Sequence, residues 1–459
     1  MNLTSQQWRT PKEVSRSIWT HQLLIIRPDN VDNEQVGALY ITGENNNKQS
    51  FKTSDMDVIL TSILATSSNV TSAAIFQVPN QPITFAGNEE ATELGEDGLI
   101  AYTWMDYVRN PSRPDYLATF PMVKTAVAAM DAITEYSAKK VSDGDWRKTI
   151  TYFYLAGASK RGCTTWLTAA FEGSKPADQR RVIGAAPIVY DSLNMTHTIP
   201  RMYELLGGWS FAFQPYARWN VTHLIGTPAF DFLTAAIDPM DSAYLPGLAN
   251  IDKLVLNTLG DEFFFPNNDQ LWWNSLPGLK HRYLAPNAEH TTITGITGIF
   301  GSIAAHLNAI LANKVKPTLN WSFSPTGTLI ATSDQQPKSV KIYRAQTIAS
   351  EPNRRDFRLI KANVEGGCLA PAFAVSDKLC FNPVWWDGKP VEGTYNPNTH
   401  TYVYQYHETL SPDFKDWVGL VFMFEYPDGQ TYTTQAAFYP DTLPFAPCGS
   451  GEACYGPFV

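Results

Sequence analysis

Ser159 lies between two stretches of different character. The residues before it, 152–158, form an apolar run with strand character, and those after it, 160–170, have a helical pattern. A strand that ends in a tight turn before a helix exposes a serine hydroxyl at the edge of a sheet, and the helix directs backbone N–H groups toward it. This arrangement is typical of a nucleophilic serine; the alternative is an ordinary strand-to-helix turn with a capping serine.

A serine hydroxyl is a weak nucleophile unless a histidine accepts its proton and a carboxylate orients that histidine. Asp261 follows the apolar run at 254–260, and His290 lies in a loop after the run at 281–285. The chain order serine, acid, histidine, each in a loop after a strand, is that of hydrolase sheets. The sequence therefore predicts a triad of Ser159, Asp261 and His290. The competing carboxylates are those of Glu262, Asp269 and Glu289.

The residues after Ser159 depart from the usual nucleophile turn. Small residues flank the serine on both sides in that pattern, but here Arg161 is the second residue after it and the glycine follows as Gly162. Two explanations are open. Either the helix leaves the sheet at an angle that lets the arginine side chain pass, or the serine is not strained as it is in common esterases.

Acyl transfer also needs hydrogen-bond donors for the negatively charged oxygen of the tetrahedral intermediate. The backbone N–H of Lys160, directly after the serine, is one expected donor. The loop that follows an early strand and contains Asn45 is expected to supply the second. The proline-flanked pair Asn80 and Gln81 is the rival for this second position.

The elements that must position these residues alternate along the chain. Strand patterns occur at 21–27, 36–43, 70–78, 152–158, 181–190, 251–259 and 281–285, and helical patterns at 55–66, 99–108, 120–140 and 296–312. The first two strands are expected to pair with each other. Strands separated by helices in this rhythm predict an α/β fold, with a mostly parallel sheet covered on both faces.

A chain of 459 residues is too long for one core and fits two domains. We predict a hydrolase domain over 1–316, with an aromatic-rich insertion at about 191–250 that could form a lid. From 317 to 459 short alternating segments separated by Gly, Pro and Asn turns predict a β-sandwich-like domain. Its Trp and Tyr side chains could form a binding platform for sugar or protein, although core packing explains most of them.

An acidic segment precedes the helix predicted at 99–108. Its carboxylates are Glu89, Glu90, Glu93, Glu96 and Asp97. Since it follows a loop at the strand ends, Glu96 or Asp97 could bind a cationic group such as the free amino terminus of a peptide; the alternative is a solvated acidic loop. In a carboxylesterase, aromatic residues of the insertion such as Trp209 would instead select an apolar acyl group.

The net charge of −9 and the absence of a basic run argue against nucleic acid as a partner. No apolar stretch approaches the ~20 residues that span a bilayer, so no membrane span is expected. The first residues lack a basic start and an apolar centre, so a secreted form would have lost its signal before this numbering begins. Without a metal-ligand cluster or a phosphate-binding glycine loop, neither a metal nor a cofactor is expected.

The cysteines and glycosylation sequons favour an extracellular protein. Cys368 lies close to Cys380 and Cys448 close to Cys454, without the histidines or paired CxxC units of a zinc site, so two short-loop disulfides are expected. Cys163 is expected to be a buried free thiol rather than a nucleophile. Asn-x-Ser/Thr sequons begin at Asn2, Asn69, Asn194, Asn220 and Asn320.

Several stretches resemble the PhoPQ-activated pathogenicity-related protein family, which includes the secreted autocrine proliferation repressor proteins. They include VPNQP, FPMVKTAVAAMDAI, GASKRGCTTWLTAA, PIVYDSLN, GDEFFFPNN and YLAPNAEHT, and the similarity runs from about residue 3 to 311. The resemblance implies an α/β-hydrolase fold related to serine peptidases of the dipeptidyl and prolyl type, followed by a β-domain. It is consistent with Ser159, Asp261 and His290 as the triad. Cys163 stands where many members have tryptophan.

These features predict a secreted serine hydrolase that acts on a peptide or a small ester. An aminopeptidase or dipeptidyl peptidase is the first expectation, and a carboxylesterase is the second. The alternative from a different class is an extracellular signalling protein, a proliferation repressor or chemorepellent, that retains the hydrolase scaffold and acts through a cell-surface receptor.

Overall fold

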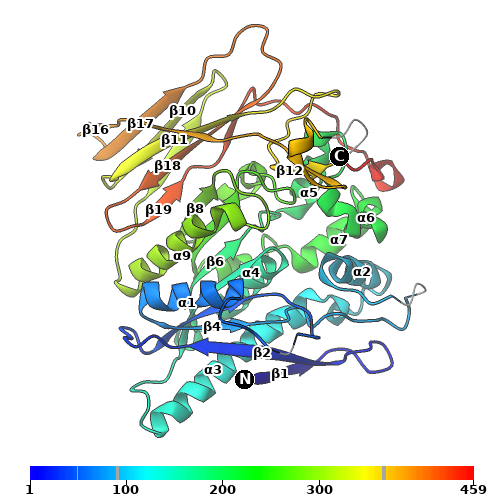
Figure 1. Ribbon diagram of the computed structural model, residues 1–459, viewed down its shortest axis with the longest axis vertical. Helices are drawn as coiled ribbons and strands as arrows, with labels where there is room; N and C mark the ends of the chain where they lie inside the picture. Colours follow the sequence, from blue (N-terminus) through cyan, green and yellow to red (C-terminus); the bar gives the residue numbers. More distant parts are fainter. Residues whose placement is uncertain (49, 89–91, 364–367) are drawn as a thin grey trace. The chain divides into compact units, whose positions relative to one another are not determined.

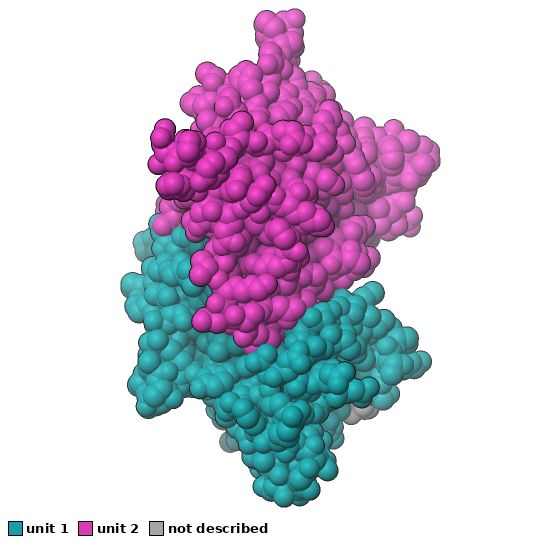
Figure 2. Space-filling model, turned by 90° about the vertical axis from the view of Figure 1, so that its left-hand side faces the viewer, with its two compact units in different colours: residues 1–190, 215–254, 275–280 teal, residues 191–214, 255–274, 281–459 magenta. Residues whose placement is uncertain are grey.

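The computed structural model describes residues 1–48, 50–88, 92–363 and 368–459. They form two compact units that interleave along the chain (Figure 2). Unit 1 comprises residues 1–190, 215–254 and 275–280, and unit 2 comprises residues 191–214, 255–274 and 281–459. This division by compactness differs from the expected boundary at residue 316, and the assignment of 1–316 and 317–459 as domains, with the insertion at 191–250, stays a prediction.

The main sheet has the strand order β1-β2-β4-β3-β5-β6-β7-β8 among the described residues. Its strands are β1 (Asn2–Gln7), β2 (Ile18–Ile26), β3 (Val36–Ile41), β4 (Thr71–Ile75), β5 (Tyr152–Ala158), β6 (Val182–Ile188), β7 (Asp252–Thr258) and β8 (Lys280–Ala285). β3 pairs in parallel with β4 and β5, and β5 in parallel with β6. Every residue of β3 is buried, as expected for a strand covered on both faces. The predicted α/β-hydrolase fold is confirmed.

The expected pairing of the first two predicted strands is wrong. β2 pairs antiparallel with β1 and β4, whereas β3 lies between β4 and β5. An apolar strand such as β3 gains more burial in the middle of a parallel sheet than in a local hairpin. The polar strand β1 was not expected from its sequence, because backbone pairing with β2 forms it rather than an apolar pattern.

Helices pack on the sheet strands in Figure 1. Their bounds are α1 (Met56–Ser68), α2 (Glu96–Arg109), α3 (Thr119–Ser142), α4 (Lys160–Gly173), α5 (Met195–Leu206), α6 (Gln214–Arg218), α7 (Pro228–Ile237), α8 (Leu245–Leu248) and α9 (Ile296–Leu311). In α3 the buried residues Met122, Ala126 and Met130 recur at helical spacing. α4 packs on β5, on β6 and against α3, and this fixes the helix that follows Ser159.

The segment Ile293–Leu311, which contains α9, corrects the expectation that no apolar stretch approaches the length of a membrane span. At 19 residues and a mean hydropathy of 1.4 it is long and apolar enough, by length and composition, to cross a membrane. A buried core helix has the same composition, and Ile299, Ile303 and Leu307 of α9 are buried. Length and composition alone therefore do not distinguish a core helix from a span.

The C-terminal strands form antiparallel sheets, which confirms the predicted all-β part. One sheet has the order β16-β17-β10-β9, a second the order β15-β11-β18-β19 with β20 paired to β18, and a third the order β12-β14-β13. The strands are β9 (Leu319–Phe323), β10 (Thr328–Ser333), β11 (Ser339–Gln346), β12 (Ile360–Ala362), β13 (Ala374–Ser376), β14 (Leu379–Phe381), β15 (Asp387–Pro390), β16 (Thr394–Asn396), β17 (Thr401–His407), β18 (Val418–Glu425), β19 (Thr431–Thr433) and β20 (Ala437–Tyr439). A cluster that includes Phe357, Trp386 and Val421 forms an apolar core here.

Both predicted disulfides are confirmed. Cys368 is bonded to Cys380 and Cys448 to Cys454, while Cys163 is free and buried, as expected. Burial raises the pKa of the Cys163 thiol to about 12, so this thiol is protonated at neutral pH and is a poor nucleophile.

Candidate active site

Ser159 occupies the single residue between β5, which ends at Ala158, and α4, which begins at Lys160. Its backbone has φ 57° and ψ −127°, a region that costs a non-glycine residue about 1–3 kcal/mol. The Ser159 N–H donates to the carbonyl of Ile188 on β6 at 2.9 Å, which holds the turn against the neighbouring strand. This is the strained strand-to-helix turn that presents a nucleophile.

Two glycines allow backbone atoms to approach closely in this turn. A Cβ on Gly157 would lie 2.7 Å from the carbonyl oxygen of Arg161, and a Cβ on Gly162 would lie 2.8 Å from that of Ile188. Neither approach is possible for a residue with a side chain, because backbone atoms would have to move. The glycine that is displaced to position 162 therefore serves the close packing of α4 on β6.

The Arg161 side chain passes away from the turn toward α2. Its Nε donates to the carbonyl of Val78, and its guanidinium donates to both carboxylate oxygens of Glu96 at 2.7 and 2.9 Å. A Cβ on Gly43 would lie 2.5 Å from Nη2 of Arg161, so a side chain at position 43 would occupy the path of the arginine. The arginine side chain thus has a path away from the turn, as the first explanation requires, and the second explanation is wrong because Ser159 is strained.

Glu96 and Asp97, predicted to bind a substrate amine, both pair with cations of the protein. Lys160 Nζ lies 2.7 Å from Glu96 and 3.2 Å from Asp97, and the Tyr216 hydroxyl donates to Asp97 at 3.0 Å. Partial burial alone would raise the pKa of the Glu96 carboxyl, but the charges of Arg161 and Lys160 outweigh it and hold this pKa far below its usual value. A substrate amine would have to displace these ion pairs. Glu89 and Glu90, of the same acidic segment, lie outside the described residues.

Asp261 and His290 form a direct pair within unit 2. His290 Nδ1 lies 3.0 Å from each carboxylate oxygen of Asp261, which is fully buried. Asp261 Oδ1 also accepts the backbone N–H groups of Phe263 and Phe264, at 2.7 and 2.9 Å, so the carboxylate is fixed in orientation. A histidine held through Nδ1 in this way carries its proton there and leaves Nε2 as the basic nitrogen.

Of the three predicted triad residues, the structure brings these two together. Ser159 belongs to unit 1, and the Asp261–His290 pair belongs to unit 2. The competing acids have other partners: Asp269 lies 3.0 Å from Arg282, and Glu289 accepts from Thr291 and Thr294.

Glu262, considered from the sequence as a rival to Asp261, instead supports the loop of His290. Its carboxylate accepts the backbone N–H of His290 at 3.0 Å and so fixes the loop that carries the imidazole. Burial, together with the charge of Asp261, raises the pKa of Glu262 to about 7. The rings of Phe263 and Phe264 lie 4.7 and 5.5 Å from that of His290. The run of an acid and aromatics after Asp261 was the only signal for these contacts.

The expected oxyanion donors differ in availability. Lys160 is the first residue of α4, where the helix leaves the backbone N–H without an intrahelical acceptor. In contrast, the backbone N–H of Asn45 donates to the Glu44 side chain at 3.0 Å. The rival Gln81 donates its side-chain amide to Glu96 and accepts the Glu96 N–H. The assignment of Asn45 as second donor thus requires a rearrangement of its loop.

The prediction of Trp209 as a substrate-binding residue needs correction. Trp209 is fully buried, and its indole N–H donates to the carbonyl of Cys454 at 2.8 Å. The ring stacks on Phe213 at 5.3 Å, and the backbone forms a bridge with Phe458. Trp209 therefore holds the C-terminal segment in place, since its ring has no exposed surface to offer a substrate.

Comparison with solved structures finds hydrolases at low similarity. Est1E from Butyrivibrio proteoclasticus is 13% identical with a TM-score of 0.35, and the match covers 64% of this chain and 96% of that one. Acetyl xylan esterase 1 from a Thermoanaerobacterium species is 12% identical with a TM-score of 0.38, over 61% and 79% of the two chains. Similarity at this level says nothing about the substrate of this chain.

Sequence comparison is more specific. Autocrine proliferation repressor protein A from Dictyostelium discoideum is 31% identical over 480 residues, which cover 99% of this chain and 87% of the relative. The model of the PhoPQ-activated pathogenicity-related proteins matches residues 1–358, which include the turn at Ser159 and the Asp261–His290 pair. Because this match extends over most of the chain, the protein belongs to the PhoPQ-activated pathogenicity-related protein family.

Proposed function

We propose that this protein is a serine hydrolase in which Ser159 attacks an acyl group, His290 is the general base and Asp261 orients the base. The observation that carries the proposal is the strained backbone of Ser159, at φ 57° and ψ −127°. A folded protein keeps such strain where the surrounding structure imposes it, and it clusters at active sites. The Asp261–His290 pair supplies the second half of the chemistry, because its geometry keeps one imidazole nitrogen basic.

In the proposed reaction the Ser159 Oγ forms a bond to the acyl carbon, and His290 takes the serine proton. The oxyanion accepts a hydrogen bond from the Lys160 backbone N–H. His290 then gives its proton to the leaving amine or alcohol as the bond from the acyl carbon breaks. Water, deprotonated by His290, attacks the acyl carbon of the acyl-enzyme. The bond between the acyl carbon and Ser159 Oγ then breaks, His290 returns its proton to Oγ, and the acid product leaves. Asp261 stabilises the imidazolium in both halves.

A peptide or a small ester is the proposed substrate. The sequence favoured a peptide with a free amino terminus, but Glu96 and Asp97 are already paired with Lys160. We therefore expect free and N-acetylated forms of the same peptide substrate to be cleaved equally well. A peptidase and a carboxylesterase then differ only in the leaving group, and parallel assays with p-nitroanilides and p-nitrophenyl esters distinguish them.

We also propose that the protein is secreted. The two disulfides support this, since such bonds persist in oxidising compartments and are rare in the cytosol.

The test of the catalytic assignment is labelling of the full-length protein by a fluorophosphonate probe, which reacts with activated serines. The wild type is expected to be labelled, and Ser159→Ala should abolish labelling without loss of the fold, because only one hydroxyl is removed. Ser174→Ala is the matched control, since Ser174 is an exposed serine at the other end of α4. A wild type that is not labelled, or a Ser159→Ala variant that is, would contradict the assignment.

A second candidate function rests on the relative named autocrine proliferation repressor protein A. In this alternative the protein represses proliferation as an extracellular signal through a cell-surface receptor, and turnover is not needed. Purified Ser159→Ala protein, added to proliferating cells that respond to the wild type, separates the two functions. An undiminished response supports signalling by the scaffold, and a lost response supports hydrolysis.

A further inference from the structure

Unit 2 contains a pocket of about 330 Å³ that is separate from the proposed catalytic residues. Three chain segments line it. The first contains the short helical turns at Asn268–Leu271 and Trp273–Ser275, the second contains the strands β9 and β10, and the third consists of Gln435 and Ala436 with Ala437, the first residue of β20. This volume is at the lower end of the range for small-molecule sites, about 300–1,000 Å³. The pocket therefore suits a ligand of one or two small rings.

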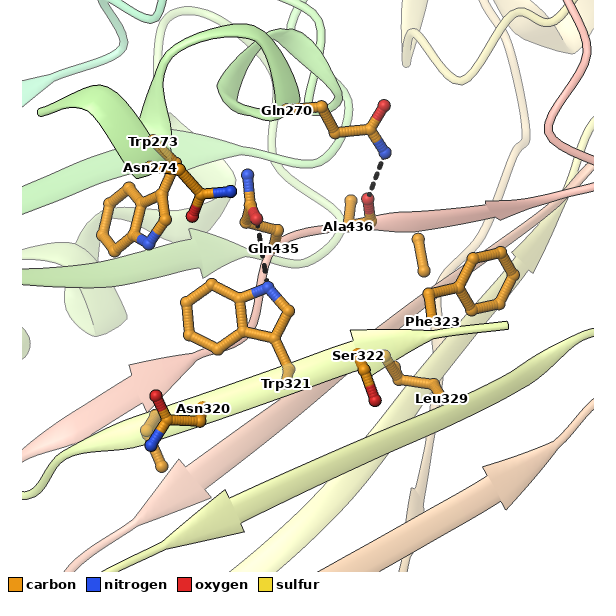
Figure 3. Close-up of a pocket in the computed structure, with 12 residues that line it drawn as sticks. Gln270, Trp273, Asn274, Asn320, Trp321, Ser322, Phe323, Leu329, Gln435 and Ala436 are labelled. Carbon is orange, nitrogen blue, oxygen red and sulfur yellow. Dashed lines mark hydrogen bonds between the residues drawn. The ribbon is translucent and has the colours of Figure 1, made fainter. Parts of the chain in front are cut away.

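Two indole rings are the largest apolar groups of the lining, which also includes Leu319, Phe323, Leu329, Ala436 and Ala437. The ring centroids of Trp273 and Trp321 lie 5.9 Å apart with an angle of 42° between the planes. Figure 3 shows both indoles at one end of the pocket, with Gln270 and Phe323 toward the other. The Trp321 indole N–H donates to Gln435 Oε1 at 3.0 Å, so the ring is held in orientation and its face, rather than its N–H, is available to a ligand.

The polar side chains of the lining are neutral. They are those of Gln270, Asn274 and Gln435; Asn320 and Ser322 also line the pocket, but their side chains alternate with that of Trp321 along β9. Among the described residues that line the pocket none is Asp, Glu, Lys, Arg or His, so no ionic group of a ligand finds a counter-charge there. Amides both donate and accept hydrogen bonds, as hydroxyl groups do. Asn274 is exposed, and Gln270 uses its Nε2 to donate to the carbonyl of Ala436 at 3.2 Å, which leaves its side-chain oxygen for a ligand donor.

These features together define the ligand chemistry. A fatty or steroid-like ligand would need a lining without so many amides, and an anionic or cationic ligand would need a charged partner. A pyranose ring has C–H bonds on one face, which pack on an indole, and hydroxyl groups at its rim, which suit amides. We propose that this pocket binds a neutral pyranose of a glycan.

The sugar could come from two sources. Asn320, Trp321 and Ser322 form a glycosylation sequon, and β9, which carries it, is an edge strand. Trp321 alternates with Asn320 along the strand, so a glycan on the exposed Asn320 would have to fold around this edge to reach the indole. The other source is a glycan of another molecule, which would enter the open pocket directly.

The test is saturation-transfer NMR of the full-length protein with the methyl glycosides of glucose, galactose, mannose and N-acetylglucosamine. At least one should bind, and Trp321→Ala should weaken its binding at least about tenfold, since the stacking surface is lost. Trp385→Ala is the matched control, because Trp385 is a tryptophan of unit 2 that is 61% exposed and lies outside the pocket lining. Asn274→Ala, at an exposed position, should weaken binding without an effect on folding.

The outcomes are distinct. Absence of binding by all four glycosides, or binding that Trp321→Ala and Asn274→Ala leave unchanged, overturns the proposal. Protein from a glycosylating host distinguishes the sources: binding by Asn320→Gln but not by the wild type assigns the pocket to the chain's own glycan, and equal binding by both assigns it to a glycan from outside. Fluorophosphonate labelling of Ser159 is a separate readout, so failure of one proposal does not imply failure of the other.

Discussion

At the scale of single residues, the backbone of Ser159 makes a quantitative prediction. Glycine adopts a positive φ without a steric penalty, whereas alanine keeps the strain of serine. Ser159→Gly should therefore have a free energy of unfolding about 1 kcal/mol higher than Ser159→Ala, although we expect both to be inactive. Chemical denaturation of the two variants measures the difference.

The matched control is the same pair of substitutions at Ser174, whose φ is −77°. There glycine has no steric advantage and should be less stable than alanine, because glycine loses more conformational freedom on folding. A Ser159→Gly variant no more stable than Ser159→Ala would show that the turn is not strained.

Glu262 should make stability depend on pH. Because its pKa is raised to about 7, folding favours the protonated carboxyl. This stabilisation is complete below the usual pKa of about 4.5 and is lost as the pH rises through 7. Glu262→Gln removes the ionisation, so its free energy of unfolding, relative to the wild type, should rise between pH 5 and pH 8. Urea denaturation at the two pH values measures the change.

Glu289→Gln is the control for this pH dependence. Burial acts to raise the pKa of Glu289, but hydrogen bonds from Thr291 and Thr294 outweigh it and lower this pKa. The stabilisation by the ionised carboxylate is therefore present above its usual pKa and is lost only as the pH falls into the acid range. Its effect should be the same at pH 5 and pH 8. Equal pH profiles for Glu262→Gln and Glu289→Gln would contradict the raised pKa of Glu262.

Residue types and order could predict the Asp261–His290 contact, because a carboxylate directly after a strand and a histidine after the next strand end at the same sheet edge. Residue types and order could not predict that Glu96 forms an ion pair with Arg161, since that contact joins residues 65 positions apart. The burial of Trp209 could not be predicted for the same reason. Its partner Cys454 is 245 positions away, and composition cannot distinguish a buried indole from a binding surface.

At the scale of elements, the ion pairs of Glu96 with Lys160 and Arg161 connect the start of α2 to the start of α4. Glu96→Gln should lower the free energy of unfolding by about 1–2 kcal/mol, less than for a fully buried pair because the Glu96 side chain is 47% exposed. Because the pKa of Glu96 is depressed, this stabilisation is present above the usual carboxyl pKa and is lost as the pH falls into the acid range. Denaturation at pH 7 measures the loss.

Activity assays separate this structural role from amine binding. If the ion pairs position the turn at Ser159, Glu96→Gln should lower kcat for free and acetylated substrates alike. A rise in KM confined to free-amine substrates would instead support the amine-binding prediction. Glu93→Gln is the matched control, since Glu93 is an exposed acid of the same segment, and it should change neither stability nor kcat.

Apolar periodicity was sufficient to predict the positions of the long helices. The helices predicted at 120–140 and 296–312 correspond to α3 (Thr119–Ser142) and α9 (Ile296–Leu311). Apolar periodicity was insufficient to predict which strands pair, since β2 and β3 are consecutive in the chain and do not pair. A parallel strand can lie beside any neighbour that a crossover reaches, so its register and place depend on packing that no local pattern contains.

At the scale of the whole molecule, the proposal of export makes the sequons testable against the fold. An N-linked glycan must project into solvent and replaces one hydrogen of the asparagine amide. Asn220 and Asn320 are exposed. Asn194, by contrast, is partly buried, and its amide nitrogen donates to the carbonyl of Leu271 at 2.9 Å, a bond between segments 77 positions apart.

Protein exported from eukaryotic cells behind a signal sequence should therefore carry glycans on Asn220 and Asn320 and none on Asn194. Peptide mass spectrometry with and without enzymatic deglycosylation measures occupancy at each site. Asn320→Gln should remove one glycan without loss of secretion, whereas Asn194→Gln should leave the mass of the glycans unchanged and lower stability by about 1 kcal/mol through its lost or weakened hydrogen bond. Full occupancy of Asn194 in stable, secreted protein would contradict this packing, because the fold would then have to accommodate a glycan where the amide now holds two segments of unit 2 together.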